Sequence, residues 1–289
     1  MNILIGLYEF ENFYGGVQTW TLTMLKAFSK MGFNVEVHTH LKKINRKLKN
    51  IPLHTQDNYD LIICNSNVVL DELSPLDGKK LFISHGILPK LEQPVEGADL
   101  YAGVSEEVAD NLIHHGFKVD AVIRNPIDVD KFYYAGCSEE LKKAAILDRR
   151  RKFAYQKELK KQHLKIVQIG HPPIIDIRKK ILDVDLVIGR GRGAYESMAM
   201  GKNVIISGNN SGRGNCELMD GMINSENFYE FRLNNCSGRR RAIEVHDFNL
   251  ILKEIRKYDH TQGKINRDLI RKNNHYLTIA EQIISLARL

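Results

Sequence analysis

The sequence lacks the features that would place it in a membrane or in an oxidising compartment. No apolar run approaches the roughly 18–20 residues that a membrane-spanning helix needs. The opening MNILIGLYEF has no basic leader, and its apolar stretch ends at Glu9 and Glu11, so it is predicted to be a strand and not a signal peptide. The four cysteines are widely spaced and form no CxxC pair, which favours reduced thiols in a cytoplasmic protein.

Two common nucleotide-binding fingerprints are also missing after the first predicted strand. Gly15-Gly16 follows that strand, but no Lys-Ser/Thr stands behind it as in a P-loop, and the full GxGxxG is absent there. A nicotinamide-dependent oxidoreductase needs that glycine pattern and an acid about 20 residues further on. It is therefore the weakest of the functions considered.

What is present is an ordinary globular composition with a basic balance. The 289 residues suit one large domain or two ordinary ones, and 43% hydrophobic with 27% charged residues argues against large-scale disorder. The net charge of +7 favours an anionic partner, such as nucleotide phosphates, a nucleic acid or an anionic membrane surface. A generally basic surface explains the charge equally well.

Short apolar runs alternate with amphipathic stretches along most of the chain. Strands are predicted at residues 2–8, 34–39, 61–64, 80–84, 100–104, 121–124, 144–147, 165–169, 186–188 and 203–207. Helices are predicted at residues 19–31, directly after Ser105, between the strand at 144–147 and about residue 162, at 194–200 and at 278–289. This alternation predicts an α/β fold whose parallel sheets are covered by helices on both faces.

A glycine-rich segment in the second half is the first candidate binding site. It reads Gly189, Arg190, Gly191, Arg192, Gly193 and joins a predicted strand to a predicted helix. Exposed backbone N–H groups, a helix dipole and two arginines would form a cradle for an anion. Glu196, one turn into the helix, can hold sugar hydroxyls. It can equally well do no more than complement the helix N-terminus.

Three further candidates stand beyond predicted strand ends. Gly15 and Gly16 would let a ligand approach the backbone at a helix N-terminus, or they form a plain tight turn. His85 could donate a hydrogen bond or carry a proton, or it is a surface turn residue. Among the basic residues that follow Leu147, Arg149 and Lys152 could clamp a diphosphate, or the cluster is a solvated helix start.

In combination these residues resemble glycosyltransferase family 4 and its GT-B relatives. The resemblance covers most of the chain at ordered points, namely Gly15–Val17 with Met31–Val35, Ile83–Gly86, Ala98–Glu106, Asn125–Phe132 and Tyr195–Ile205. It implies two Rossmann-like domains facing a cleft. Residues 1–130 would form the acceptor domain, 140–275 the nucleotide-sugar domain, and 276–289 a terminal helix that can return to the first domain.

The resemblance also assigns roles residue by residue. Glu196 matches the second glutamate of the family's E-x(7)-E motif, which holds the donor ribose, while Ile188 stands where the first would be. Gly15 and Gly16 match glycines near the diphosphate and the acceptor, and His85 matches a histidine near the reacting sugar. We therefore expect transfer of a hexosyl or pentosyl group from a nucleotide sugar such as a UDP-sugar, with retention. Replacing His85 or Glu196 by alanine should impair turnover without unfolding the chain.

No metal or other cofactor is expected. Asp128-Val129-Asp130 follows an Asn-Pro turn and Asp183-Val184-Asp185 precedes its strand, and neither context suits the metal-binding DxD of single-domain glycosyltransferases. The leaving diphosphate would instead be stabilised by a helix dipole and basic side chains. The unusual Ile188 supports an alternative, a non-catalytic protein that binds a nucleotide sugar or a nucleic acid on a degraded GT-B scaffold.

The acceptor stays open at this stage. The basic segment from Lys42 to Lys49 could lie on a membrane surface, which would suit a lipid-linked or polysaccharide acceptor and a peripheral membrane location. It could instead follow the phosphates of a nucleic acid, which would suit glycosylation of modified bases. A solvated loop is the third interpretation.

Overall fold

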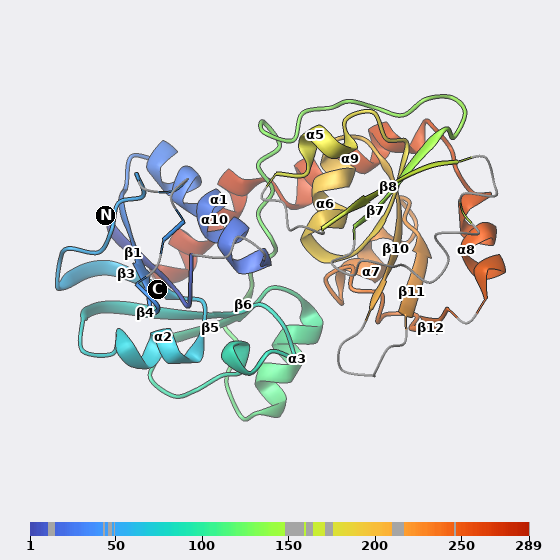
Figure 1. Ribbon diagram of the computed structural model, residues 1–289. Coiled ribbons are helices and arrows are strands. Elements are labelled where there is room, and N and C mark those ends of the chain that lie inside the picture. Colours follow the sequence, from blue (N-terminus) through green and yellow to red (C-terminus); the bar gives the residue numbers. More distant parts are fainter. Residues whose placement is uncertain are drawn as a thin grey trace. The chain divides into compact units, whose positions relative to one another are not determined.

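The computed structural model describes residues 1–10, 15–42, 44–45, 48, 50–147, 159, 164–170, 176–209, 217–245 and 247–288. They form two compact units (Figure 1). Unit 1 comprises Met1–Pro126 and Tyr276–Leu289, and unit 2 comprises Ile127–His275. The C-terminal helix α10 (Tyr276–Ala287) therefore belongs to unit 1. No helix in the described ranges combines the length and the apolarity needed to cross a membrane.

Unit 1 is built on a six-stranded sheet in which every pair of neighbours is parallel. Its strands are β1 (Asn2–Leu7), β2 (Asn34–Thr39), β3 (Asn58–Cys64), β4 (Asp77–Ser84), β5 (Leu100–Gly103) and β6 (Ala121–Val122). Their spatial order is β2-β1-β3-β4-β5-β6. Because β1 lies between β2 and β3, the direction of chain crossover reverses there, and this is where ligands bind in open α/β sheets.

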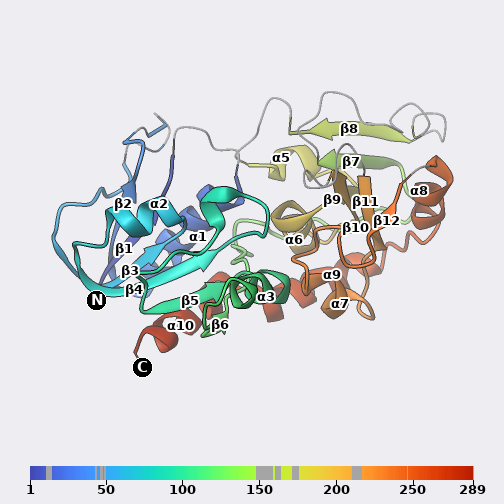
Figure 2. The same ribbon diagram turned by 90° about the horizontal axis from the view of Figure 1, so that it is seen from below.

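Helices cover both faces of this sheet. The helices α1 (Gly16–Lys30) and α10 pack on one face with Ile3, Ile5 and Leu61. The other face, with Leu4 and Ile62, is covered by α2 (Asn67–Glu72) and α3 (Glu106–His114) (Figure 2). A short 3-10 turn, η2 (Lys90–Glu92), lies between β4 and β5. The strands are buried on both faces, so their continuous apolar runs match the prediction.

Local signals fix the ends of these helices as the sequence predicted. The Ser105 side chain accepts a hydrogen bond from the backbone N–H of Val108 and caps α3. Gly32, at φ +81°, ends the α1 segment in the left-handed conformation, and the N–H of Phe33 reaches back to the carbonyl of Phe28. Ser66 caps α2 in the same way as Ser105 caps α3.

Unit 2 has a second six-stranded sheet, in the order β12-β11-β10-β9-β7-β8. Its strands are β7 (Lys143–Leu147), β8 (Lys165–Ile169), β9 (Leu186–Gly189), β10 (Asn203–Asn209), β11 (Glu217–Met222) and β12 (Ile243–Glu244). The pairs among β7–β10 are parallel, whereas β11 and β12 run antiparallel to their neighbours. The crossover direction reverses between β7 and β9, which creates a second switch point.

The helices of unit 2 lie on both faces of its sheet (Figure 1). One face carries α5 (Arg178–Ile181), α6 (Gly191–Ala199), α7 (Phe228–Arg232) and α9 (Gln262–Asn273), and the other carries α8 (Phe248–Ile255). One expected boundary is wrong. The helix predicted to begin at Ala194 begins at Gly191, so part of the expected glycine turn is helical.

Candidate functional site

In unit 1 the switch point between β1 and β3 is held together by an asparagine. Asn65 follows β3 directly and is buried. Its backbone N–H and its side-chain Nδ2 both donate to the carbonyl of Gly6 in β1, at 3.0 and 3.1 Å. Since the amide nitrogen is committed to that carbonyl, the Oδ1 atom is the one left to face another donor.

That donor is His85, which directly follows β4. Its Nε2 lies 2.7 Å from Oδ1 of Asn65. The ring packs edge-on against Trp20 of α1, with centroids 5.4 Å apart and planes at 83°. Because Oδ1 can only accept, the Nε2 of a neutral His85 carries the proton and Nδ1 is the acceptor nitrogen. The expected strand-end histidine is thus oriented from two sides.

The two glycines at the start of α1 differ in their surroundings. A Cβ on Gly15 would lie 2.2 Å from Oε1 of Gln18, because that amide folds back over the glycine. A Cβ on Gly16 would meet nothing within 4 Å. Among the described residues, the buried Gln18 Oε1 and Trp20 Nε1 have no hydrogen-bond partner. Buried polar atoms of this kind call for an explanation, and a bound group is one of the usual ones.

In unit 2 the predicted anion cradle sits at the β9–α6 junction beside the second switch point. A Cβ on Gly193 would lie 2.9 Å from Cδ1 of Leu147, and one on Gly189 would lie 3.0 Å from its Cβ. The two glycines therefore let α6 approach the end of β7 closely. Gly191, at φ +55°, donates its N–H to the carbonyl of Cys236 at 2.8 Å. Arg190 precedes the helix and lies along Gly208 of β10.

The charged residues of α6 form a buried ion pair. Nε of Arg192 lies 2.8 Å from Oε1 of Glu196, and their side chains are only 8% and 10% exposed. Burial raises the pKa of Glu196 and lowers the pKa of Arg192, and the opposite charge of each partner counteracts the effect. Glu196 is thus positioned one turn into the helix, as predicted, but its carboxylate is already engaged by a guanidinium.

A loop of arginines that the sequence analysis missed begins beside the same helix terminus. Asp220 of β11 is fully buried and accepts hydrogen bonds from the backbone N–H groups of Gly238 and Arg241, at 3.0 and 2.8 Å. This carboxylate shapes the loop that carries Arg239, Arg240 and Arg241. Cys236, just before the loop, accepts the N–H of Gly191, whereas Arg241 in the loop pairs with Glu230 at 3.0 Å.

Three of the four aspartates in the two DxD strings make hydrogen bonds or an ion pair within unit 2. Asp185 accepts hydrogen bonds from the backbone N–H groups of Ser138, Lys142 and Lys143, at 2.9–3.0 Å. Asp183 pairs with Lys143, and Asp128 accepts from the backbone N–H of Lys131. In the described part of the chain, no group of three or more His, Cys, Asp or Glu side chains is arranged to hold a metal ion.

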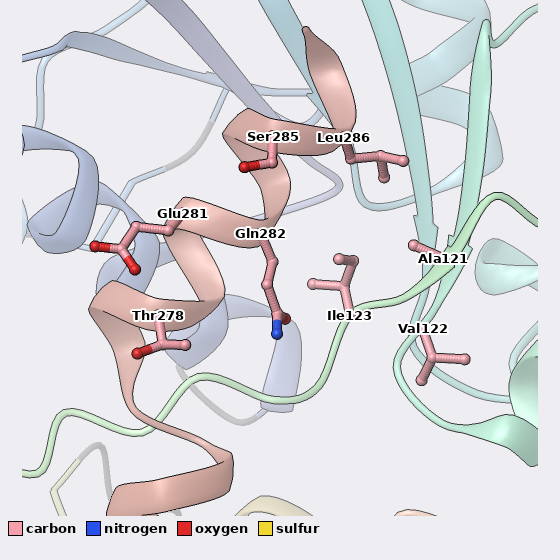
Figure 3. Close-up of a pocket in the computed structure, with 8 residues that line it drawn as sticks. All are labelled: Ala121, Val122, Ile123, Thr278, Glu281, Gln282, Ser285 and Leu286. Carbon is pink, nitrogen blue, oxygen red and sulfur yellow. The ribbon is translucent and has the colours of Figure 1, made fainter. Parts of the chain in front are cut away.

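Two cavities in the described part of unit 1 are lined by none of Gly15, Gly16 and His85, although Lys42 of the basic segment lines one of them. One of about 470 Å³ lies between residues 121–123 and α10, where Gln282 and Leu286 extend toward Ile123 and Ala121 (Figure 3). The other, of about 540 Å³, lies beside β2 and is lined by His38, His54 and Glu72 among others. Neither cavity forms part of the two switch points.

Comparison with known proteins adds the architecture to this geometry. No family model and no curated protein sequence matches the chain. The solved structure of AviGT4, a glycosyltransferase involved in avilamycin A biosynthesis, matches 99% of this chain and 97% of its own, with 12% identity and a TM-score of 0.58. An alpha-glucosyltransferase in complex with UDP and a 13-mer DNA containing an A:G mismatch matches over 100% of both chains, with 14% identity and a TM-score of 0.58. The T4 phage beta-glucosyltransferase does so with 15% identity and a TM-score of 0.54.

The chain has the GT-B fold. Identities this low show the fold alone, so membership of family 4 stays a prediction. Within the GT-B fold, His85 and the glycine pair belong to unit 1, and the Gly189–Gly193 segment with Glu196 belongs to unit 2. Arg149 and Lys152 lie outside the described residues. Ile188 of β9 is 1% exposed and packs in the core with Met219 and Ile251, so its position is a core position of the sheet.

Proposed function

We propose that the protein is a glycosyltransferase that moves a sugar, with UDP-glucose as the first donor to test, onto an acceptor hydroxyl. The observation that carries the proposal is that each unit of this GT-B fold places predicted site residues at a sheet switch point. In unit 1 these are His85 with Asn65, and in unit 2 they are the residues at the start of α6. The neighbours whose structures contain UDP support the choice of donor nucleotide.

In this proposal unit 2 binds the donor. The first turn of α6 directs backbone N–H groups and the positive end of the helix dipole at the diphosphate. Arg190, whose side chain lies along Gly208, adds positive charge, so that the diphosphate can leave without a metal ion. Glu196 holds the ribose hydroxyls while Arg192 keeps its carboxylate ionised. Transfer should therefore persist in EDTA.

We infer that the acceptor is a hydroxylated base in DNA. The net charge of +7 favours a polyanion, and neighbours with this fold have been solved with DNA. Binding that weakens steeply with salt for duplex DNA, and is absent for anionic liposomes, would support this choice. Stronger binding to the liposomes would favour a lipid-linked acceptor instead.

The deciding experiment is a panel of UDP-, GDP- and ADP-sugars offered with duplex DNA that contains hydroxymethylated pyrimidines. We expect sugar transfer from a UDP-sugar, with retention at the anomeric carbon as the family resemblance implies, read by mass spectrometry and proton NMR. If the protein binds donors but neither hydrolyses nor transfers the sugar of any donor in the panel, the proposal that it is an enzyme is refuted. It would favour the non-catalytic binding protein, which the core position of Ile188 supports.

A further inference from the structure

The turn after β4 places a second titratable side chain against Gly86, the residue that follows His85. The η2 turn is tied to the strand ends by two hydrogen bonds, from Ser84 Oγ to the carbonyl of Glu92 at 2.8 Å and from Asn67 Nδ2 to the carbonyl of Lys90 at 2.8 Å. The Glu92 carboxylate reaches back to Gly86, where a Cβ would lie 2.7 Å from its Oε2. Glycine at position 86 therefore leaves room for this carboxylate beside the predicted catalytic histidine.

The Glu92 carboxylate has no internal partner in the part of the chain that the structure describes. No hydrogen bond or ion pair joins its oxygens to a described residue, although the side chain is more than half buried. Burial alone raises its pKa from 4.5 to about 7. The titratable side chains on the surrounding segments are Lys90 of its own turn, His85 at the end of β4 and the acidic residues of α2 and α3, and none of them contributes to the shift.

Such a carboxylate destabilises the fold in its charged form, so it calls for a reason beyond stability. The structure supplies one, because His85, held by Asn65, lies at the end of the same strand and packs against Trp20 of α1, whose Nε1 has no hydrogen-bond partner among the described residues. The Glu92 side chain is only partly buried, and a carboxylate oxygen at this edge can accept the hydrogen bond of an incoming hydroxyl. A nearly neutral pKa is also the value at which proton transfer to a carboxylate is most effective.

We propose that Glu92 binds the acceptor hydroxyl and takes its proton during sugar transfer. The inference rests on the proposed glycosyltransferase function. For retention, the acceptor oxygen bonds to the anomeric carbon on the face from which the diphosphate departs, and the electron pair of the broken carbon–oxygen bond leaves with the diphosphate. The hydroxyl proton passes to the Glu92 carboxylate and from there to solvent. His85, held by Asn65, then stabilises the sugar and need not act as the base.

The test compares Glu92→Gln with the wild type and with Glu96→Gln, a control at an exposed position four residues further along the same connection. Transfer to saturating acceptor is measured from pH 5.5 to 9. We expect wild-type kcat to fall tenfold per pH unit below about pH 7, because the protonated carboxyl cannot take the proton. Glu92→Gln should lower kcat about 10²–10⁴-fold and remove this acidic limb, while donor affinity stays within twofold. The control should match the wild type.

A stability measurement separates this role from a structural one. A carboxyl whose pKa is raised on folding makes the folded protein less stable as pH rises from about 4.5 through about 7. On account of Glu92 the wild type should therefore have a lower melting temperature at pH 8 than at pH 5. Glu92→Gln should be at least as stable as the wild type at pH 8, whereas loss of a structural carboxylate would lower its melting temperature. If Glu92→Gln stays active and keeps the same fall in kcat at low pH, the role of Glu92 is overturned while the proposed glycosyltransferase function stands. A wild type that transfers no sugar from any donor would overturn the proposed function as well.

Discussion

Replacing Glu196 by alanine should cost unit 2 about 3 kcal/mol of folding free energy, before any effect on catalysis. Its partner Arg192 is 8% exposed and would lose the carboxylate that pairs with it, while the negative charge of Asp128 would still act on it. Breaking a buried ion pair by removing one side typically costs about 3–5 kcal/mol. We take the lower end because a guanidinium on the first turn of a helix can reach water by a small rearrangement. The sequence alone led us to expect a folded, inactive Glu196→Ala protein, and the pair changes that expectation.

The matched control removes both charges at once. In Arg192→Met/Glu196→Leu the site becomes apolar at similar volume, and such replacements of a buried pair are often neutral or stabilising. We expect the double variant to lie within about 1 kcal/mol of the wild type, although each single change costs about 3 kcal/mol. Hydrogen exchange of the α6 amides is the suitable assay, because it reports on unit 2 without requiring that the two units unfold together.

The same variants separate folding from function. If Glu196 holds the donor ribose, the double variant should be folded yet bind a UDP-sugar at least tenfold more weakly, as measured by calorimetry. The reasoning about the pair would be refuted if the α6 amides of Glu196→Ala had exchange free energies within about 0.5 kcal/mol of those in the wild type. Unchanged donor affinity in the folded double variant would instead remove Glu196 from the donor site and leave the pair as a purely structural one.

Two further predictions concern stability. Glu36 accepts hydrogen bonds from Tyr59 Oη and Thr55 N, and although burial opposes ionisation, these bonds lower its pKa from 4.5 to about 2. Its contribution, about 2 kcal/mol, should be present above pH 4.5 and disappear as pH falls toward 2, whereas Glu36→Gln should flatten this acid limb in urea titrations. Gly201→Ala should cost more than about 2 kcal/mol, because φ is +77° and the Cβ would lie 2.3 Å from the Tyr134 ring. Gly116→Ala, at φ +87° with nothing within 4 Å, should cost only about 1 kcal/mol, and equal losses would contradict the packing argument.

The alternation of strands and helices in the sequence was sufficient to predict the α/β fold, because buried parallel strands read as short apolar runs. Residues such as Ser105 and Gly32 marked helix ends through purely local interactions, and the structure has both. The start of α6 could not be predicted in the same way. Glycine has a poor helix propensity, so Gly191–Gly193 suggested a turn. Packing of Gly193 against Leu147, which is distant in sequence, favours the helix instead.

The candidate site residues also differ in whether local sequence or tertiary structure reveals them. His85 was found because it follows a predicted strand, and strand ends are where sites form in such sheets. Asn65 also follows a strand, yet its role depends on β1 and β3 being neighbours, which spacing alone does not reveal. Glu92 lacks any motif. Its proximity to Gly86 arises from how the η2 turn folds back on the end of β4, which is a tertiary feature.

The electrostatics of the two switch points favour a division of labour between the units. The start of α6 combines a helix N-terminus with Arg190, and in the proposed function this arrangement would stabilise a nucleoside diphosphate. The unit 1 edge carries the Glu92 carboxylate, whose ionisation no neighbouring cation supports, because burial alone sets its pKa. A diphosphate at that edge would face repulsion from the carboxylate, whereas a neutral hydroxyl would be held by it. The donor is therefore better matched to unit 2 and the acceptor hydroxyl to unit 1. The same difference explains why the weakly acidic carboxyl of Glu92 would be useful in unit 1 and the tightly paired carboxyl of Glu196 in unit 2.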